Sequence, residues 1–227
     1  GERRLPRRTN TRERLIATAA DLFCRQGYAH TGVNEIMQQA KTTSGSFYHF
    51  FPTKEDLVLA VVDHIGDSLD TEVFTTDLEP AGEPLERVFA VLESSRRLLI
   101  ENDFALGSPL GTLAAELSES HPQVRERLAE LFSGWARRMQ ELLEDAGDRL
   151  PRDLDRAALA DVILSTIEGA FLHARVRRSP APFDAAISVL RSHLESLTVD
   201  SPPVAPRTAQ PRPAPRTRAS TVDWRAW

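Results

Sequence analysis

Cysteine and aromatic residues are scarce in this chain. Its 227 residues include one cysteine, Cys24, and Phe, Trp and Tyr together make up 7%. A single cysteine excludes an internal disulfide and any metal site built from several cysteines. A helical cysteine next to a phenylalanine is usually a small core residue, and a redox-sensor role for Cys24 is the open alternative.

Several other features are missing as well. No apolar run is long enough to span a bilayer, so we expect a soluble protein without a membrane partner. No signal peptide is recognisable, and we expect a cytoplasmic location. His64, His121, His173 and His193 lack metal-ligand spacing, and no GxSxG motif or phosphate-cradling glycine loop occurs. We therefore expect neither catalysis nor a bound metal or cofactor.

Apolar residues recur every three or four positions over residues 11–26, which predicts a first helix. Thr31 is the expected N-cap of a second helix. About three residues then separate it from a third helix at 44–50, a spacing at which two helices cross steeply. Thr43 or Ser44 is the expected N-cap of this third helix. Pro52 ends this helix, and Thr53 with a carboxylate three residues later predicts the start of a fourth.

The same spacing continues downstream, and alternating strand patterns are absent. Five more helices are expected, at about 85–99, 110–117, 122–147, 154–177 and 183–197. The predicted fold is all-α with about nine helices, in which an N-terminal three-helix helix-turn-helix head precedes a C-terminal helical bundle.

The charge is unevenly distributed along the chain. Residues 1–56 carry nine Lys/Arg and six Asp/Glu, and residues 201–227 carry five Arg and one Asp, whereas the whole chain has a net charge of −5. Only the two ends are basic. An acidic body with a basic head is typical of a protein that approaches a phosphate backbone with one face.

Residues 11–64 resemble the N-terminal domain of the TetR family of bacterial transcriptional regulators. The likeness rests on four ordered motifs: a helix ending LFxxxGY, a threonine before the second helix, SGSFYHFF, and the opening PTKEDL. The chain departs from the family in the turn, where Lys41 and Thr42 replace the usual glycine and small apolar residue. A left-handed residue that is not glycine costs roughly 1 kcal/mol.

The resemblance implies a double-stranded DNA operator as partner, and the chemistry of the residues suggests their roles. Hydroxyl side chains at the start of the third helix are candidates for base edges or nearby phosphates, and its glycine permits close approach. The matching aromatic and imidazole residues of the family hold the sugar-phosphate backbone. The predicted DNA contacts are Thr31, Lys41, Thr42, Thr43, Ser44, Gly45, Ser46, Tyr48, His49 and Lys54. The alternative is that the hydroxyls serve only as turn and cap groups.

The family resemblance also implies a homodimer and an effector pocket. Apolar faces on the last two long helices, about 154–177 and 183–197, are the expected dimer interface. The effector is an unknown small molecule, and the candidate pocket residues are Phe89, Ser95, Phe104, Leu113, Trp135, Met139, Phe171 and His173. Each of them is alternatively an ordinary core residue.

These expectations divide the chain into four parts. Residues 1–10 form a basic flexible arm, residues 11–53 the helix-turn-helix DNA-binding domain, residues 54–200 an effector-binding and dimerisation domain, and residues 201–227 a disordered tail rich in proline and arginine. The expected function is a ligand-responsive repressor that an effector releases from a palindromic operator by shifting the fourth helix. A DNA-organising protein that does not repress is the alternative.

Overall fold

The structure, a computed structural model, describes residues 11–74, 83–104 and 107–198. Within these ranges the regular structure is entirely helical, so the predicted all-α fold is confirmed. The helices are α1 (Thr11–Gln26), α2 (Val33–Gln39), α3 (Ser44–Phe50), α4 (Lys54–Phe74), α5 (Pro84–Glu101), α6 (Pro109–Leu117), α7 (Pro122–Asp145), the short 3-10 turn η1 (Gly147–Arg149), α8 (Arg156–Arg177) and α9 (Ala181–Leu197). The predicted arm at 1–10 and tail at 201–227 lie outside the described residues.

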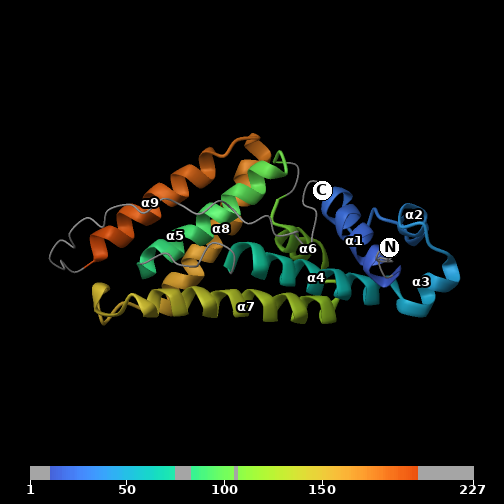
Figure 1. The fold of residues 1–227 in the computed structure, drawn as a ribbon, viewed down its shortest axis with the longest axis horizontal. Coiled ribbons are helices and arrows are strands. Elements are labelled where there is room, and N and C mark those ends of the chain that lie inside the picture. The colour runs from blue at the N-terminus through green and yellow to red at the C-terminus, as the bar shows by residue number, and fades with distance from the viewer. Residues whose placement is uncertain (1–10, 75–82, 105–106, 199–227) are drawn as a thin grey trace, which may run out of the picture.

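The molecule is elongated, with α1 to α3 at one end and the other helices in a bundle behind them (Figure 1). Apolar side chains from all three head helices meet in a small core, in which Leu15, Phe23, Ile36 and Phe47 have no exposed surface. This core fixes how α3 projects from the head.

Helix starts follow the predicted caps with one exception. Thr43 caps α3, since its hydroxyl accepts a hydrogen bond from the Ser46 N–H. The Thr53 hydroxyl accepts from the Asp56 N–H at 3.0 Å, and the Asp56 carboxylate accepts from the Thr53 N–H at 2.9 Å. The prediction that Thr31 caps the second helix is wrong, because α2 begins after Gly32 and no side chain caps it.

The helix α4 connects the head to the bundle. It packs against α1 near its start and against α5 and α7 further along. At Gly66 a Cβ atom would lie 2.9 Å from a methyl group of Leu131 on α7. The missing side chain therefore allows α4 and α7 to lie in close contact.

By length and composition alone, α8 could cross a membrane, which the sequence analysis did not anticipate. It packs between α7 and α9 in the bundle, with Ile163 and Ala174 fully buried. It also carries charged residues, among them Asp161 and Glu168. We therefore treat α8 as a bundle helix.

Candidate functional site

The turn between α2 and α3 contains the left-handed residue that the sequence predicted. Lys41 has a φ of 51°. Its N–H donates to the Gln38 carbonyl at 3.2 Å, and the next N–H, of Thr42, donates to Met37 at 2.9 Å. These bonds close the turn without glycine and leave the Lys41 side chain exposed.

Helix α3 presents one polar and aromatic face to solvent. Thr43, Ser44, Gly45 and His49 are exposed, and Tyr48 keeps 53% of its surface accessible. A Cβ atom built on Gly45 would meet nothing within 4 Å. The start of this helix is therefore accessible to solvent.

Two of the predicted hydroxyl contacts are less available. The Ser46 hydroxyl is half-buried and lies 3.3 Å from that of Thr43. The hydroxyl of Thr42 is buried without a hydrogen-bond partner. Thr42 thus points into the head in this conformation, contrary to its predicted role at a base edge.

Thr31 is also placed differently from the prediction of a phosphate contact. Its side chain is 1% exposed, and its hydroxyl donates to the Gly27 carbonyl at 2.7 Å. Its N–H donates to the Tyr28 carbonyl at 3.2 Å. Both of its donors therefore hold the loop between α1 and α2 in place.

Lys54, the other predicted phosphate contact, reaches into the head instead of outward. Its ammonium donates a hydrogen bond to the Tyr28 carbonyl and lies 3.9 Å from the centre of the Tyr28 ring. Partial burial lowers the pKa of Lys54, and the nearby carboxylate of Glu116 opposes that shift. The contacts make Lys54 a link between α4 and the loop after α1.

Glu116, which the sequence analysis missed, secures the same loop from the bundle side. Its carboxylate on α6 accepts hydrogen bonds from the N–H groups of Tyr28 and Ala29, at 2.8 and 2.6 Å. The ring of Tyr28 also packs edge-on against His121 at 5.1 Å. Lys54 and Glu116 therefore hold one loop from two different helices.

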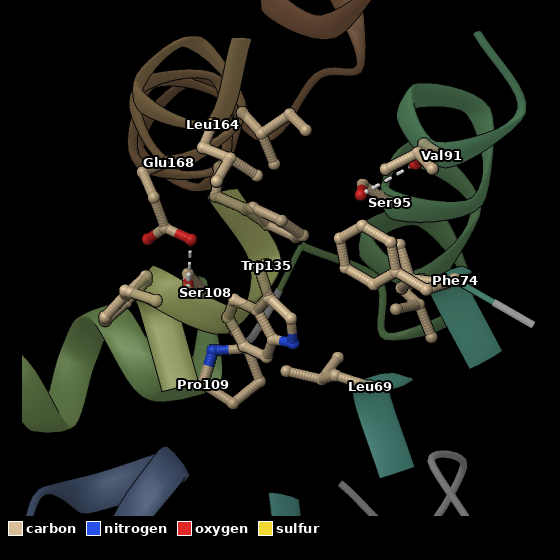
Figure 2. A pocket seen from close by; sticks show the side chains of 14 residues that line it. Leu69, Phe74, Val91, Ser95, Ser108, Pro109, Trp135, Leu164 and Glu168 are labelled. Atoms are coloured by element: carbon tan, nitrogen blue, oxygen red, sulfur yellow. Dashed lines mark hydrogen bonds between the residues drawn. The ribbon is translucent and has the colours of Figure 1, made fainter. Parts of the chain in front are cut away.

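An apolar pocket lies in the bundle, where α4, α5, α6, α7 and α8 meet (Figure 2). Its cavity volume is small in this structure, about 50 Å³, so a ligand of ordinary size would require the surrounding helices to move apart. Its lining comprises Leu69, Val73, Phe74, Val91, Ser95, Leu98, Ser108, Pro109, Phe132, Trp135, Leu164, Ile167, Glu168 and Phe171.

Three of the eight predicted pocket residues, Ser95, Trp135 and Phe171, line this pocket. The other five lie elsewhere. Phe89 packs under the Arg191 guanidinium, 3.8 Å from its ring centre. Leu113 and Met139 are fully buried core residues, and Phe104 is packed against the core. His173 is exposed on α8, so its predicted place in a pocket is wrong.

Among the described residues that line the pocket, Glu168 alone is ionisable, and it was not among the predicted pocket residues. Its Oε1 accepts a hydrogen bond from the Ser108 hydroxyl at 3.0 Å, shown in Figure 2. Burial raises the pKa of Glu168, and the bond from Ser108 partly opposes this. Ser108 is also the N-cap of α6, because its hydroxyl accepts from the Gly111 N–H.

The structure also bears on the reactivity of Cys24 and on possible metal sites. Cys24 is 3% exposed, and burial strongly raises the pKa of its thiol, which keeps it in the unreactive protonated form. No group of three or more His, Cys, Asp or Glu residues within the described ranges is arranged to hold a metal ion.

Known proteins match both parts of this architecture. Residues 15–61 match the family described as bacterial regulatory proteins, tetR family, and residues 84–189 match the C-terminal domain of LmrA/YxaF-like transcriptional regulators. An uncharacterised helix-turn-helix transcriptional regulator of Mycobacterium tuberculosis is 31% identical over 188 residues, which cover 81% of this chain and 93% of that protein.

Other relatives agree in length and fold. The transcriptional repressor DhaR of Mycobacterium sp. strain GP1 is 26% identical, over 81% of this chain and 91% of its own length. The crystal structure of a TetR transcriptional regulator from Chloroflexus aurantiacus is 27% identical, with a TM-score of 0.74 over 83% of this chain and 96% of its own. On these matches and its helix-turn-helix head, the chain belongs to the TetR family of bacterial transcriptional regulators, not to a family of enzymes.

Proposed function

We propose that this chain is a cytoplasmic, ligand-responsive repressor, which a small-molecule effector releases from a palindromic operator. One arrangement carries the proposal. The helices α4 and α6 each contribute residues to the apolar pocket, and each also contacts the loop that supports the DNA-binding head. A ligand in the pocket would therefore contact both of the helices that connect the bundle to the head.

The DNA contacts come from the part of the head that remains open. Ser44, Gly45 and Tyr48 form the exposed face of α3, with Lys41 exposed in the turn before it. A recognition helix of this motif enters the major groove by its N-terminal residues. We assign base reading to Thr43 and Ser44, and backbone contact to Lys41, Tyr48 and His49.

A homodimer is part of the proposal, because a palindrome needs two heads about one helical turn, or a multiple of 34 Å, apart. Large apolar side chains remain exposed on the last two helices: Val162, Leu172 and Val176 on α8 and Val189 on α9. The three on α8 fall on one side of the helix together with Gly169. Such a stripe matches a surface that a second copy would cover.

Release follows from how α6 is held at its two ends. At its start Ser108 bonds to Glu168 in the pocket, and eight residues later Glu116 bonds to the loop of the head. An effector that displaces the start of α6 and the end of α4 would favour a different position of the head. The effector would shift the population between the two positions of the head by the difference between its affinities for them.

Selection of bound DNA from a random pool tests the DNA half of the proposal. A palindrome with two equal half-sites is expected. A mobility shift on the selected sequence, with and without metabolite fractions, then tests release. Failure to select DNA at moderate salt contradicts the DNA-reading function, and a shift that no fraction changes favours the DNA-organising alternative.

A further inference from the structure

The polar groups of the pocket are nearly all engaged within the protein. The Ser95 hydroxyl donates to the Val91 carbonyl at 2.9 Å, and the Trp135 indole N–H donates to Asp70 at 2.8 Å. The Ser108 hydroxyl donates to Glu168 and accepts from the Gly111 N–H. The carboxylate of Glu168 is the group that still has accepting capacity, since a carboxylate has about four lone-pair sites.

None of the described residues that line this pocket carries a positive charge. Glu168 also faces an outer groove between α7 and α8, whose charged residues are Arg137 and Asp161, one of each sign. The second oxygen of Glu168, Oε2, lies against the Gly111 backbone, where a Cβ atom would collide with it. Among the described residues, the hydrogen-bond partner of this carboxylate is the Ser108 hydroxyl, and no ammonium or guanidinium group pairs with it.

Aromatic rings form the wall opposite this carboxylate (Figure 2). Trp135 stacks with Phe74 at 6.2 Å between ring centres and meets Phe132 edge-on at 5.4 Å. Ring faces attract cations, and more strongly when water is excluded. A single negative charge among aromatic rings therefore favours one class of ligand.

We propose that the effector is a bulky apolar or aromatic molecule with one protonated amine, and that this amine pairs with Glu168. The inference rests on the proposed effector pocket and names its ligand class. The ammonium donates to the carboxylate, while the apolar part of the molecule covers Leu69, Phe74 and Trp135. Because Glu168 already accepts from Ser108, the same contact reaches the N-cap of α6.

The test uses three probes that share one skeleton: 3,3-diphenylpropylamine, 3,3-diphenylpropanol and 3,3-diphenylpropanoate. Their binding to the full chain is measured by calorimetry at pH 7. The amine is expected to bind at least tenfold more tightly than the alcohol, and the acid more weakly than both. Equal affinities, tighter binding of the acid, or no binding of the amine would overturn the proposal.

Two matched variants test whether the preference for the amine probe depends on Glu168. Glu168→Gln keeps the shape and can still accept from Ser108, so the amine should lose at least tenfold in affinity while the alcohol is unaffected. Glu126→Gln makes the same charge change at an exposed position of α7 and should alter nothing. Retained alcohol binding shows that the Glu168→Gln pocket is folded, and an unchanged amine preference in this variant contradicts the pairing.

The DNA complex separates this inference from the proposed function. If the amine binds through Glu168 but leaves the selected DNA complex intact, the ligand class stands and release by that ligand fails. If DNA is released by compounds that bind equally to wild type and Glu168→Gln, release stands and the ligand class is wrong.

Discussion

At the residue scale, Tyr48 combines an exposed aromatic ring with a fixed position. Its ring packs edge-on against the buried Phe47 at 5.1 Å, while 53% of the residue stays accessible. A rigid exposed tyrosine loses little conformational entropy on binding, because only two side-chain torsions are involved. It is therefore well suited to hold a phosphate through its hydroxyl.

Replacing Tyr48 by Phe should weaken operator binding about tenfold, roughly 1.4 kcal/mol, because one hydrogen bond to the backbone is lost. The loss should be similar on different half-sites, since a backbone contact carries no sequence information. Titration of the selected DNA with each variant measures it. The same change at Tyr28, whose ring is buried in the head, is the control and should leave DNA affinity unchanged.

The chain has two lysines, Lys41 and Lys54, and replacing them should have opposite effects on stability and on the salt dependence of DNA binding. Lys54→Met should lower the free energy of unfolding by about 1–2 kcal/mol, because the ammonium contacts to Tyr28 are lost, and should leave the salt dependence of DNA binding unchanged. Lys41→Met should reduce the slope of log K against log salt by about 0.9 per protomer at unchanged stability. Thermal unfolding measures the stability of each variant, and DNA titrations at several salt concentrations measure the slope of log K against log salt. A reduced slope for Lys54→Met would show that Lys54 contacts phosphate after all.

Glu168 should make stability depend on pH. Its pKa is raised in the folded chain, so the folded state holds this proton more tightly than the unfolded state does. The stabilisation from protonation is complete below the ordinary pKa of 4.5 and is lost as pH rises through the raised value. Glu168→Gln should therefore raise the melting temperature at pH 7 and give no gain below pH 4.5.

Melting curves of Glu168→Gln, Glu126→Gln and wild type across this pH range measure the effect. Glu126 is exposed on α7, so its replacement should not change the pH dependence. A Glu168→Gln protein that is no more stable than wild type at pH 7 would show that the carboxylate is well solvated.

At the element scale, helix ends could be predicted because their signals are local. Thr43 and Thr53 precede their helices by one residue and cap them as expected. Thr31 has the same chemistry, but its hydroxyl bonds backwards to Gly27 in the preceding turn. A hydroxyl in a loop does not reveal which neighbouring backbone group it will bond, so its role could not be read from the sequence.

Contacts between distant elements could not be predicted in the same way. Glu116 bonds to N–H groups 87 and 88 positions earlier in the chain. Glu168 lies on a helix whose other acidic residue, Asp161, is exposed, and a single carboxylate on a helix usually faces water. Trp135 and Phe171 line the pocket, whereas Leu113 and Met139, chosen from the same apolar spacing, are core residues. Apolar spacing predicts burial and does not separate a pocket wall from the core.

The nine-residue helix α6 should transmit strain between pocket and head. Glu116→Ala removes the acceptor of two N–H groups and should lower the free energy of unfolding by about 1 kcal/mol. Hydrogen exchange at the Tyr28 and Ala29 amides should become faster, and NMR or mass spectrometry measures this. Glu119→Ala, an exposed carboxylate just after α6, is the control; unchanged exchange in Glu116→Ala would show that water replaces the bonds without cost.

At the scale of the whole molecule, the described part of the head is not basic. Residues 11–56 carry five Lys/Arg and five Asp/Glu, so the basic excess of the N-terminal part resides in residues 1–10. The expectation of a basic head therefore applies to the segment before α1. Within the described head, phosphate attraction depends on a few exposed groups such as Lys41 and not on overall charge.

The dimer should depend on the apolar stripe of α8. Replacing both Leu172 and Val176 by Glu is expected to raise the dimer dissociation constant at least about 100-fold, because charges would then be buried at the interface. Light scattering across a concentration series measures the mass. Ile100→Glu changes a 39% exposed residue on α5 and should leave the mass unchanged; a dimeric double variant would place the interface elsewhere.

Tyr28 is the residue on which both connections converge: Lys54 of α4 contacts its carbonyl and ring, and Glu116 of α6 contacts its N–H. Under the proposed release, a compound that moved α4 and α6 in concert would move the head as a rigid body and change the direction in which α3 projects. A compound that moved only one of the two helices would separate Lys54 from Glu116, and the loop that contains Tyr28 would unfold locally. Two effectors of equal affinity would thus release DNA by different routes. Only the one that moves both helices together would leave a folded head that can still bind a different DNA sequence.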